Sequence, residues 1–252
     1  AGMEAARVAR IRGHEVSVWE RDGQLGGKLE VAGLAPSKRE VLRFRDFQAR
    51  RLAELGVEIH LSAEVTAEVV AAHEPDAVVI ATGAEPLIPP IPGIGSAIVH
   101  DAQALLRGDV PVAGGERVVV VGGSATGCET AEHLAGLGAE VTILEMRRGV
   151  GHGIEAITRR HLLRELRRAG VHILTEAKVV MIEPDEVLYE DADGARHAVP
   201  ADLVALALGW RPVGHVLAQR LGDVEIVVLG DAAQPADFVH AINAGADAGL
   251  TL

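Results

Sequence analysis

The chain has 252 residues, of which 48% are hydrophobic and 2% aromatic, and its formal net charge is −12. This length and apolar content suffice for two sizeable cores, whereas the acidic charge and the scarcity of aromatic side chains argue against a nucleic-acid surface. No apolar run reaches transmembrane length, no cleavable signal is visible, and the single cysteine rules out an intrachain disulfide and a protein-held iron–sulfur cluster. We therefore expect a cytoplasmic protein with no membrane or nucleic-acid partner.

Residues 1–20 and 126–145 form an internal repeat that aligns without a gap. Each copy opens a helix at one glycine, ends it at another, and runs through an apolar strand to a glutamate. These positions are Gly2, Gly13 and Glu20 in the first copy and Gly127, Gly138 and Glu145 in the second. The pattern is typical of a dinucleotide-binding βαβ unit, in which the pyrophosphate lies on the helix N-terminus and the acid binds a ribose.

The two copies differ in what precedes the helix. The second follows an apolar strand and a glycine turn, residues 117–127, which predicts a phosphate loop. That loop would be formed by Gly122, Gly123, Ser124 and Gly127, with Ser124 standing where the motif has its middle glycine. The first copy starts at Ala1 with no strand before it. We therefore expect its unit to be cut through the phosphate loop, with Ala1 and Gly2 as the tail of that loop.

Further elements follow Glu20 in chain order. A glycine-containing loop at residues 22–27 leads to a helix at residues 41–55 and a strand at residues 56–61. The basic segment 38–51 also contains acidic and apolar residues, so we interpret it as a solvated helix face. A buried strand at residues 76–83 then runs into a glycine turn and a connector with four prolines between residues 86 and 92. Such a connector is stiff and predicts a domain crossing.

The second repeat begins a domain that we place at residues 111–215, with a hairpin at 185–199 that turns at Asp193 and Gly194. A last buried strand at residues 225–231 ends in Asp231, and an acid in that position indicates a ligand edge. We interpret this final segment as a return to the first domain. The predicted fold is α/β, with two Rossmann-like dinucleotide-binding domains: residues 1–110 and 216–252, lacking a first strand, and the inserted domain 111–215.

Several short motifs carry a resemblance to a known family. They are residues 23–27 (GQLGG), 81–83 (ATG) with Pro86, 92–93 (PG), 122–129, 208–212 (LGWRP), 230–231 (GD) and 241–245 (AINAG). Across essentially the whole chain the sequence resembles the C-terminal flavin and nicotinamide domains of the 2,4-dienoyl-CoA reductase, enoate reductase and trimethylamine dehydrogenase group. These are multidomain members of the old yellow enzyme superfamily. The absence of a Cys-x-x-Cys pair excludes disulfide-reductase chemistry.

The resemblance implies a set of cofactor-binding residues. For FAD in the first domain these are Ala1, Gly2, Glu20, Gly26, Gly27, Lys28, Thr82, Gly83, Gly230, Asp231, Ala241 and Ile242. Glu20 would bind the adenosine ribose, Asp231 the ribitol chain or a phosphate, and the helix from Ala241 would point at the isoalloxazine ring. For NAD(P)H in the second domain they are Gly122, Gly123, Ser124, Gly127, Glu129 and Glu145. Glu145 would bind the adenosine ribose, and Glu129 the nicotinamide amide.

The function implied by the resemblance is hydride transfer from NAD(P)H to FAD, with no side chain acting as acid, base or nucleophile. Electrons would continue through a 4Fe-4S cluster to FMN in a preceding barrel domain, outside this chain, that reduces an unsaturated acyl or carbonyl substrate. Glu145 favours NADH, although Arg147 and Arg148 offer partners for a 2′-phosphate. Two alternatives stay open: a structural ADP-holding module, as in trimethylamine dehydrogenase, and a stand-alone reductase of a small electron carrier.

Other reactive side chains have simpler explanations. Cys128 fits a small core residue better than a redox group. Glu4 fits a residue that complements a helix dipole, and for Glu129 this role is as good an explanation as contact with a ligand. His152, His161 and His172 lack metal-ligand spacing with carboxylates or cysteines, so no metal site is predicted.

Overall fold

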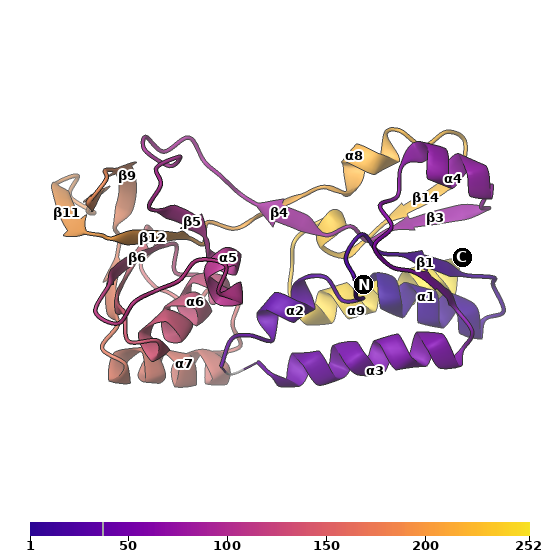
Figure 1. The fold of residues 1–252 in the computed structure, drawn as a ribbon, viewed down its shortest axis with the longest axis horizontal. Coiled ribbons are helices and arrows are strands. Elements are labelled where there is room, and N and C mark those ends of the chain that lie inside the picture. Colours follow the sequence, from indigo (N-terminus) through magenta and orange to yellow (C-terminus); the bar gives the residue numbers. More distant parts are fainter. Residues whose placement is uncertain (37) are drawn as a thin grey trace. The chain divides into compact units, whose positions relative to one another are not determined.

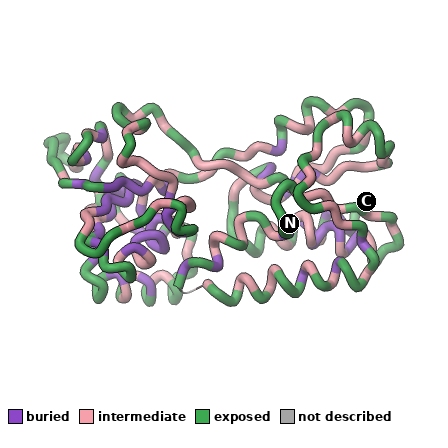
Figure 2. Tube along the Cα trace, in the orientation of Figure 1, coloured by how far each residue is buried: buried purple, intermediate pink, exposed green. Residues whose placement is uncertain are grey.

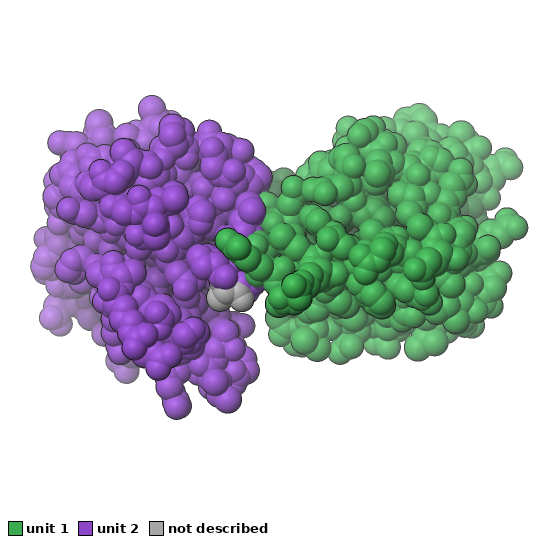
Figure 3. Space-filling view, turned by 60° about the horizontal axis from the view of Figure 1, so that its bottom comes forward, with its two compact units in different colours: residues 1–33, 39–85, 210–252 green, residues 34–38, 86–209 purple. Residues whose placement is uncertain are grey.

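The computed structural model describes residues 1–36 and 38–252 and divides the chain into two compact units (Figure 1, Figure 3). Unit 1 comprises Ala1–Gly33, Arg39–Glu85 and Trp210–Leu252, and unit 2 comprises Leu34–Lys38 and Pro86–Gly209. The main crossings therefore lie at residues 85/86 and 209/210, whereas the domain bounds expected from the sequence lay at 110/111 and 215/216. No helix in the described part of the chain is long and apolar enough to cross a membrane.

Unit 1 is built from helices around short strand pairs. Its helices are α1 (Gly2–Ile11), α2 (Lys28–Ala32), α3 (Glu40–Glu54), α4 (Ala67–His73), α8 (Gly214–Ala218), α9 (Phe238–Thr251) and the 3-10 turn η1 (Gly230–Ala232). Its strands are β1 (Ser17–Trp19), β2 (Glu58–His60), β3 (Ala77–Ile80), β4 (Ala84–Pro86, whose last residue belongs to unit 2), β13 (Trp210–Pro212) and β14 (Glu225–Val228). β1 pairs with β2, β14 with β3, and β13 with β4.

Helix α1 lies at the centre of unit 1 and serves two apolar clusters. One cluster joins Met3 and Ala6 to residues of β1 and α3, and the other joins Ala5 to residues of β3, β14 and α9. α9 approaches α1 very closely, because a Cβ on Gly245 would lie 2.4 Å from the carbonyl oxygen of Ala1. The glycines of α9 therefore bring its backbone against α1, and the two helices hold the strand pairs in place.

Unit 2 has a five-stranded parallel sheet and a three-stranded antiparallel sheet. Its strands are β5 (Val99–Asp101), β6 (Arg117–Val121), β7 (Glu140–Glu145), β8 (His172–Thr175), β9 (Lys178–Ile182), β10 (Glu186–Glu190), β11 (Arg196–Pro200) and β12 (Leu203–Leu206). The parallel order is β5-β12-β6-β7-β8, and the antiparallel order is β11-β10-β9. The helices are α5 (Ala102–Arg107), α6 (Ala125–Gly136) and α7 (Ala156–Arg168).

Strand β6 is the centre of unit 2. It is hydrogen-bonded to β12 on one side and β7 on the other, and its four valines are at most 2% exposed (Figure 2). Val118 and Val120 pack into a cluster with α6 and α7, whereas Val119 and Val121 pack toward the antiparallel sheet. A parallel strand covered on both faces reads as a continuous apolar run, which explains the four consecutive valines. The expected α/β class is confirmed, as is the expected β10–β11 hairpin.

Candidate functional site

The turn from β6 into α6 is too crowded for side chains at two glycines. Gly122 has φ +103°, and a Cβ there would lie 2.5 Å from the carbonyl oxygen of Ala207. A Cβ on Gly127, in the first turn of α6, would lie 1.9 Å from the carbonyl oxygen of Gly122. The turn and the helix–strand approach therefore both require glycine. The result is a helix N-terminus held over the carboxyl ends of parallel strands, a position where unpaired N–H groups favour an anion.

A second loop supports this turn from outside. A Cβ on Gly123 would lie 2.5 Å from Cγ1 of Val150, and the amide of Gly151 donates a 2.6 Å hydrogen bond to the carbonyl oxygen of Gly123. Ser124 forms a parallel bridge with His152. Ser124 is also the N-cap residue of α6, but within the described chain its hydroxyl makes no capping hydrogen bond. The loop that the sequence predicts as phosphate-binding is thus fixed from two sides.

Glu145, the last residue of β7, is joined to the same turn. Its side chain is only 7% exposed, yet its carboxylate accepts hydrogen bonds from the amides of Gly123, at 2.7 Å, and Arg147, at 2.8 Å. A carboxylate has about four acceptor positions. These two bonds therefore brace the loop and leave Glu145 acceptor capacity for the hydroxyl groups of a ribose.

Two neighbours on α6 have distinct environments. Glu129 is 7% exposed, and its Oε1 lies 2.6 Å from Nζ of Lys38. Cys128 is fully buried, and this burial raises the pKa of its thiol to about 11. A thiol that stays protonated near neutral pH is a poor nucleophile. Cys128 is a core residue, as expected, whereas the Lys38–Glu129 pair was not foreseen.

In unit 1, three segments meet at the N-terminus of α1. A Cβ on Gly230 would lie 2.8 Å from Cβ of Ala1, and a Cβ on Gly2 would lie 3.0 Å from Cβ of Ala81. The loop after β14 and the turn after β3 therefore both approach this helix end. Gly83, in that turn, has φ +77° and nothing within 4 Å of the position of a Cβ. Thr82 and Gly83 therefore directly follow Ala81, the residue of this turn that approaches the N-terminus of α1.

Lys28 and Asp231 form the charged part of this group. Nζ of Lys28 lies 3.1 Å from Oδ2 of Asp231 and 3.8 Å from the ring centroid of Trp210. The two preceding glycines have different surroundings. At Gly26 a Cβ would lie 2.6 Å from the side chain of Arg45, whereas at Gly27 (φ +50°) it would meet nothing within 4 Å. Gly26 therefore permits α3 to pack here, and Gly27 leaves backbone open beside Lys28.

The remaining predicted residues of unit 1 occupy other positions. Glu20 follows β1, where its amide donates to the carbonyl oxygen of His60 and its carboxylate accepts from the amide of Asp22. Ala241 and Ile242 are half-buried residues near the start of α9. The contacts therefore gather Ala1, Gly230, Asp231 and Lys28 into one group, and leave Glu20 at the end of β1.

Glu4 belongs to a buried polar network. Its carboxylate accepts two hydrogen bonds from Arg7, of 2.9 and 2.6 Å, and one of 2.7 Å from the amide of Gln48. The bond from Arg7 is the main reason that the pKa of Glu4 is lowered. Gln48, which is 2% exposed, comes from α3. Glu4 therefore joins α1 to α3, a role beyond the dipole interaction expected from its position.

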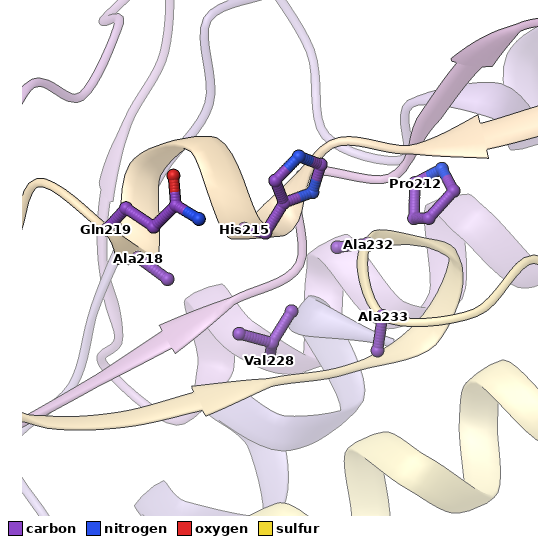
Figure 4. A pocket seen from close by; sticks show the side chains of 7 residues that line it. All are labelled: Pro212, His215, Ala218, Gln219, Val228, Ala232 and Ala233. Atoms are coloured by element: carbon purple, nitrogen blue, oxygen red, sulfur yellow. The ribbon is translucent and has the colours of Figure 1, made fainter.

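The structure also contains a pocket that the sequence did not indicate. It lies between α8, β14 and η1, and its lining includes His215 on α8, Gln219 directly after that helix, and Val228 on β14 (Figure 4). Pro212, Ala218, Ala232 and Ala233 complete its lining. Among the residues that the structure describes, no group of three or more His, Cys, Asp or Glu side chains is placed to hold a metal ion.

Several known proteins are similar to this chain in sequence and in fold. Residues 1–228 match the family described as pyridine nucleotide-disulphide oxidoreductase, and the chain belongs to this family. It is 37% identical to the NADH oxidase of Thermoanaerobacter brockii and to the bilirubin reductase of Mediterraneibacter gnavus; each match covers 97% of this chain and 38% of the relative. A structure of 2-naphthoyl-CoA reductase with 2-naphthoyl-CoA superimposes with a TM-score of 0.92 at 30% identity, covering 99% of this chain and 38% of that one.

These similarities confirm the expected resemblance to the 2,4-dienoyl-CoA reductase, enoate reductase and trimethylamine dehydrogenase group. The chain is a dinucleotide-binding oxidoreductase module with a Rossmann-like α/β fold. It spans less than two-fifths of the length of the relatives named above.

Proposed function

We propose that unit 2 binds NADH, that unit 1 binds FAD, and that the chain supplies the NADH-to-flavin step of a larger oxidoreductase. The observation that carries this proposal is the turn from β6 into α6, where the closeness of Gly127 to Gly122 leaves room for backbone only. Such a turn places helix N–H groups where a pyrophosphate binds in Rossmann-like domains. The family of the chain supports the same assignment.

In unit 2, the backbone from Gly122 to Ser124 and the first turn of α6 would hold the pyrophosphate of NADH. Glu145 would accept hydrogen bonds from the adenosine ribose, and its negative charge would repel the 2′-phosphate of NADPH. Arg148 already pairs with Glu176 at 3.2 Å, which ties that arginine to a neighbouring carboxylate. We therefore attribute the proposed preference for NADH to Glu145, which is buried and hydrogen-bonded to the loop.

The nicotinamide end of NADH has a candidate partner in Glu129, which would accept a hydrogen bond from the carboxamide. Because Nζ of Lys38 lies 2.6 Å from the Glu129 carboxylate, this ion pair holds the carboxylate in position. Lys38 would thus act as a positioning residue for Glu129.

In unit 1, the N-terminus of α1 and the open backbone at Gly27 and Gly83 would hold the FAD pyrophosphate and its surroundings. Gly26 would line the same side, Asp231 would bind the ribitol chain or a phosphate, and Glu20 would bind the adenosine ribose. Ala241 and Ile242 would lie at the isoalloxazine ring. The fit is supported by the meeting of Ala1 with Gly230 and by the absence of steric obstruction at Gly27 and Gly83. A bound FAD supplies reversible two-electron chemistry that no side chain offers.

The proposal extends to a longer protein in which this chain would be one part. Since the relatives are longer than this chain, we propose that an attached FMN and 4Fe-4S domain receives the electrons and reduces an unsaturated acyl or carbonyl compound. The names of the relatives, a bilirubin reductase and a cinnamate reductase, support a reductase of unsaturated substrates.

The deciding experiment is a titration of the chain with FAD and with NADH separately, followed by anaerobic mixing. Loss of the flavin absorbance of the bound FAD on adding NADH is the expected result. NADH binding without FAD uptake would contradict the FAD assignment of unit 1. Binding of ADP alone would replace the proposal with a structural nucleotide-holding module.

A further inference from the structure

All three phenylalanines of the chain meet at one place on the surface of unit 1. Phe44 and Phe47 lie on α3 with ring centroids 6.4 Å apart, and Phe44 meets Phe238, the first residue of α9, edge-to-face at 5.0 Å. Phe47 is 46% exposed, Phe238 41%, and the adjacent Val239 61%. We call Phe44, Phe47, Phe238 and Val239 the phenylalanine patch.

This concentration of aromatic side chains is not explained by the core. Every large side chain that is fully buried in the described structure is aliphatic, so the phenylalanines are not used to fill the interior. An exposed aromatic cluster is typical of the centre of a protein interface, where aromatic residues are enriched. The patch is therefore a candidate for contact with another protein surface.

The edge of the patch is positively charged on a negatively charged protein. Arg43, Phe47 and Arg50 follow each other at helical spacings of four and three, so they share one exposed face of α3. Residues 38–51 contain six basic and two acidic side chains, although the whole chain carries a net charge of −12. A partner for this face would combine an apolar centre with an acidic edge.

The patch is held by rigid elements. Also on α3, Gln48 and Leu52 are at most 2% exposed and anchor the helix. α9 is anchored by glycines that pack against the backbone of α1. An aromatic surface whose backbone is fixed in advance loses little conformational entropy on binding. The patch thus has the properties of a preformed docking surface.

Its location connects it to the proposed flavin site, on which this inference partly rests. Phe238 precedes Ala241, assigned above to the isoalloxazine ring, by three residues. α3, which carries Phe44 and Phe47, packs its Arg45 side chain against Gly26. A partner on the patch would therefore lie beside the flavin end of the FAD site.

We propose that the phenylalanine patch docks the part of such a longer protein that lies outside the shared region, which under the proposed function is a second redox domain, and that this partner has an apolar centre and an acidic edge at the contact. The relatives extend well beyond the region shared with this chain, and this chain covers only 38% of the first two. Under the proposed function, the remainder of such a protein receives electrons from its dinucleotide module. A docking face beside the flavin site meets that requirement.

The test uses the part of the Thermoanaerobacter brockii NADH oxidase that lies outside the shared region, produced as a separate protein. Its binding to this chain is measured by surface plasmon resonance at low and high salt. We expect binding to the unmodified chain that Phe47→Glu weakens at least tenfold and that Arg43→Glu weakens with a reduced dependence on salt. Ile157→Glu, at an apolar side chain that is 75% exposed on α7, is the matched control and should leave binding unchanged.

Three outcomes would overturn the proposal: no binding to the unmodified chain, equal binding by Phe47→Glu and the control, or a dimer of the unmodified chain that Phe47→Glu dissociates in sedimentation. FAD titration of Phe47→Glu is made in parallel. Retained FAD binding with lost docking supports the patch as a docking face, whereas lost FAD binding would place Phe47 in the cofactor site. Because docking is measured as physical binding, it is judged separately from the proposed electron transfer.

Discussion

The carboxylate of Glu145 accepts a 2.7 Å hydrogen bond from the amide of Gly123, so the last residue of β7 holds the turn that follows β6. The acid is buried and also accepts a bond from the amide of Arg147. In the proposed NADH site, one side chain therefore has two tasks, bracing the loop and binding the ribose. Removing it should affect both the stability of unit 2 and the selectivity for NADH.

We expect Glu145→Ala to weaken NADH binding by about tenfold or more, since a hydrogen bond to a charged group contributes about 1.5–3 kcal/mol. Affinity for NADPH should fall less, because the repulsion of the 2′-phosphate is also removed. Fluorescence titration with each nucleotide measures both effects. Glu140→Gln, at the exposed first residue of the same strand, is the control. An unchanged ratio of the two affinities would refute the ribose role.

Gly127→Ala should disrupt the phosphate loop. Its methyl group would lie 1.9 Å from the carbonyl oxygen of Gly122, a separation that forces α6 away from β6. We expect loss of NADH binding and a lower melting temperature. Gly136→Ala, in the last turn of the same helix, meets nothing within 4 Å and should stabilise by about 0.4–1 kcal/mol. Equal melting temperatures for the two variants would contradict the steric account.

Local sequence patterns predicted much of this fold because they are set by short-range physics. The valine run of β6 indicated an apolar strand, and the glycines at 122 and 127 indicated a tight strand-to-helix turn. Contacts between segments that are far apart in the sequence are not indicated by any such local pattern. Lys28 meets Asp231 across 203 positions of sequence, and Lys38 reaches Glu129 from a segment assigned to unit 2 by packing alone.

The difference in unit bounds has a similar cause. Prolines between residues 86 and 92 indicated a crossing, but nothing local shows on which side the following residues pack. In the structure, Ile91, Ile98 and Val99 pack against the core of unit 2. The phenylalanine patch was also hidden in the sequence, because Phe238 lies almost two hundred residues from Phe44.

Asp202 should contribute to stability in a pH-dependent manner. Hydrogen bonds from the side chain and then the amide of Arg117 lower the pKa of this carboxyl to about 2. Because the folded-state pKa lies below the ordinary value of about 3.9, the contribution is fully present above about pH 4 and disappears as the pH falls toward 2. We expect Asp202→Asn to lower the melting temperature at pH 7 but not at pH 2.

Thermal unfolding of both proteins across this range is the measurement. Asp223→Asn, at an exposed aspartate with no ion pair among the described residues, serves as control and should show no such convergence. A melting-temperature difference for Asp202→Asn that stayed constant from pH 7 to pH 2 would be inconsistent with the ion pair.

Cys128 should react slowly with alkylating reagents. Its side chain is fully buried and its thiol pKa is raised to about 11, so very little thiolate is present at pH 8. Reaction then requires opening of unit 2. We expect iodoacetamide labelling, followed by mass spectrometry, to be slower than for glutathione by several orders of magnitude and to accelerate in denaturant. Labelling as fast as that of free glutathione would show that Cys128 is accessible in the folded protein.

The positions of the tryptophans and the cysteine allow the unfolding of each unit to be followed separately. Trp19 and Trp210 both belong to unit 1, whereas Cys128 belongs to unit 2. Intrinsic fluorescence therefore follows the melting of one unit, and thiol labelling follows the other. The strands β1 and β14 each pair with a single neighbour in the described structure, whereas β6 is bonded along both edges. Fewer cross-strand bonds mean a lower free energy of opening, so on heating the tryptophan fluorescence of unit 1 changes at a lower temperature than the labelling of Cys128 in unit 2. A ligand of unit 1 raises the unfolding temperature of that unit and so reduces the difference between the two temperatures.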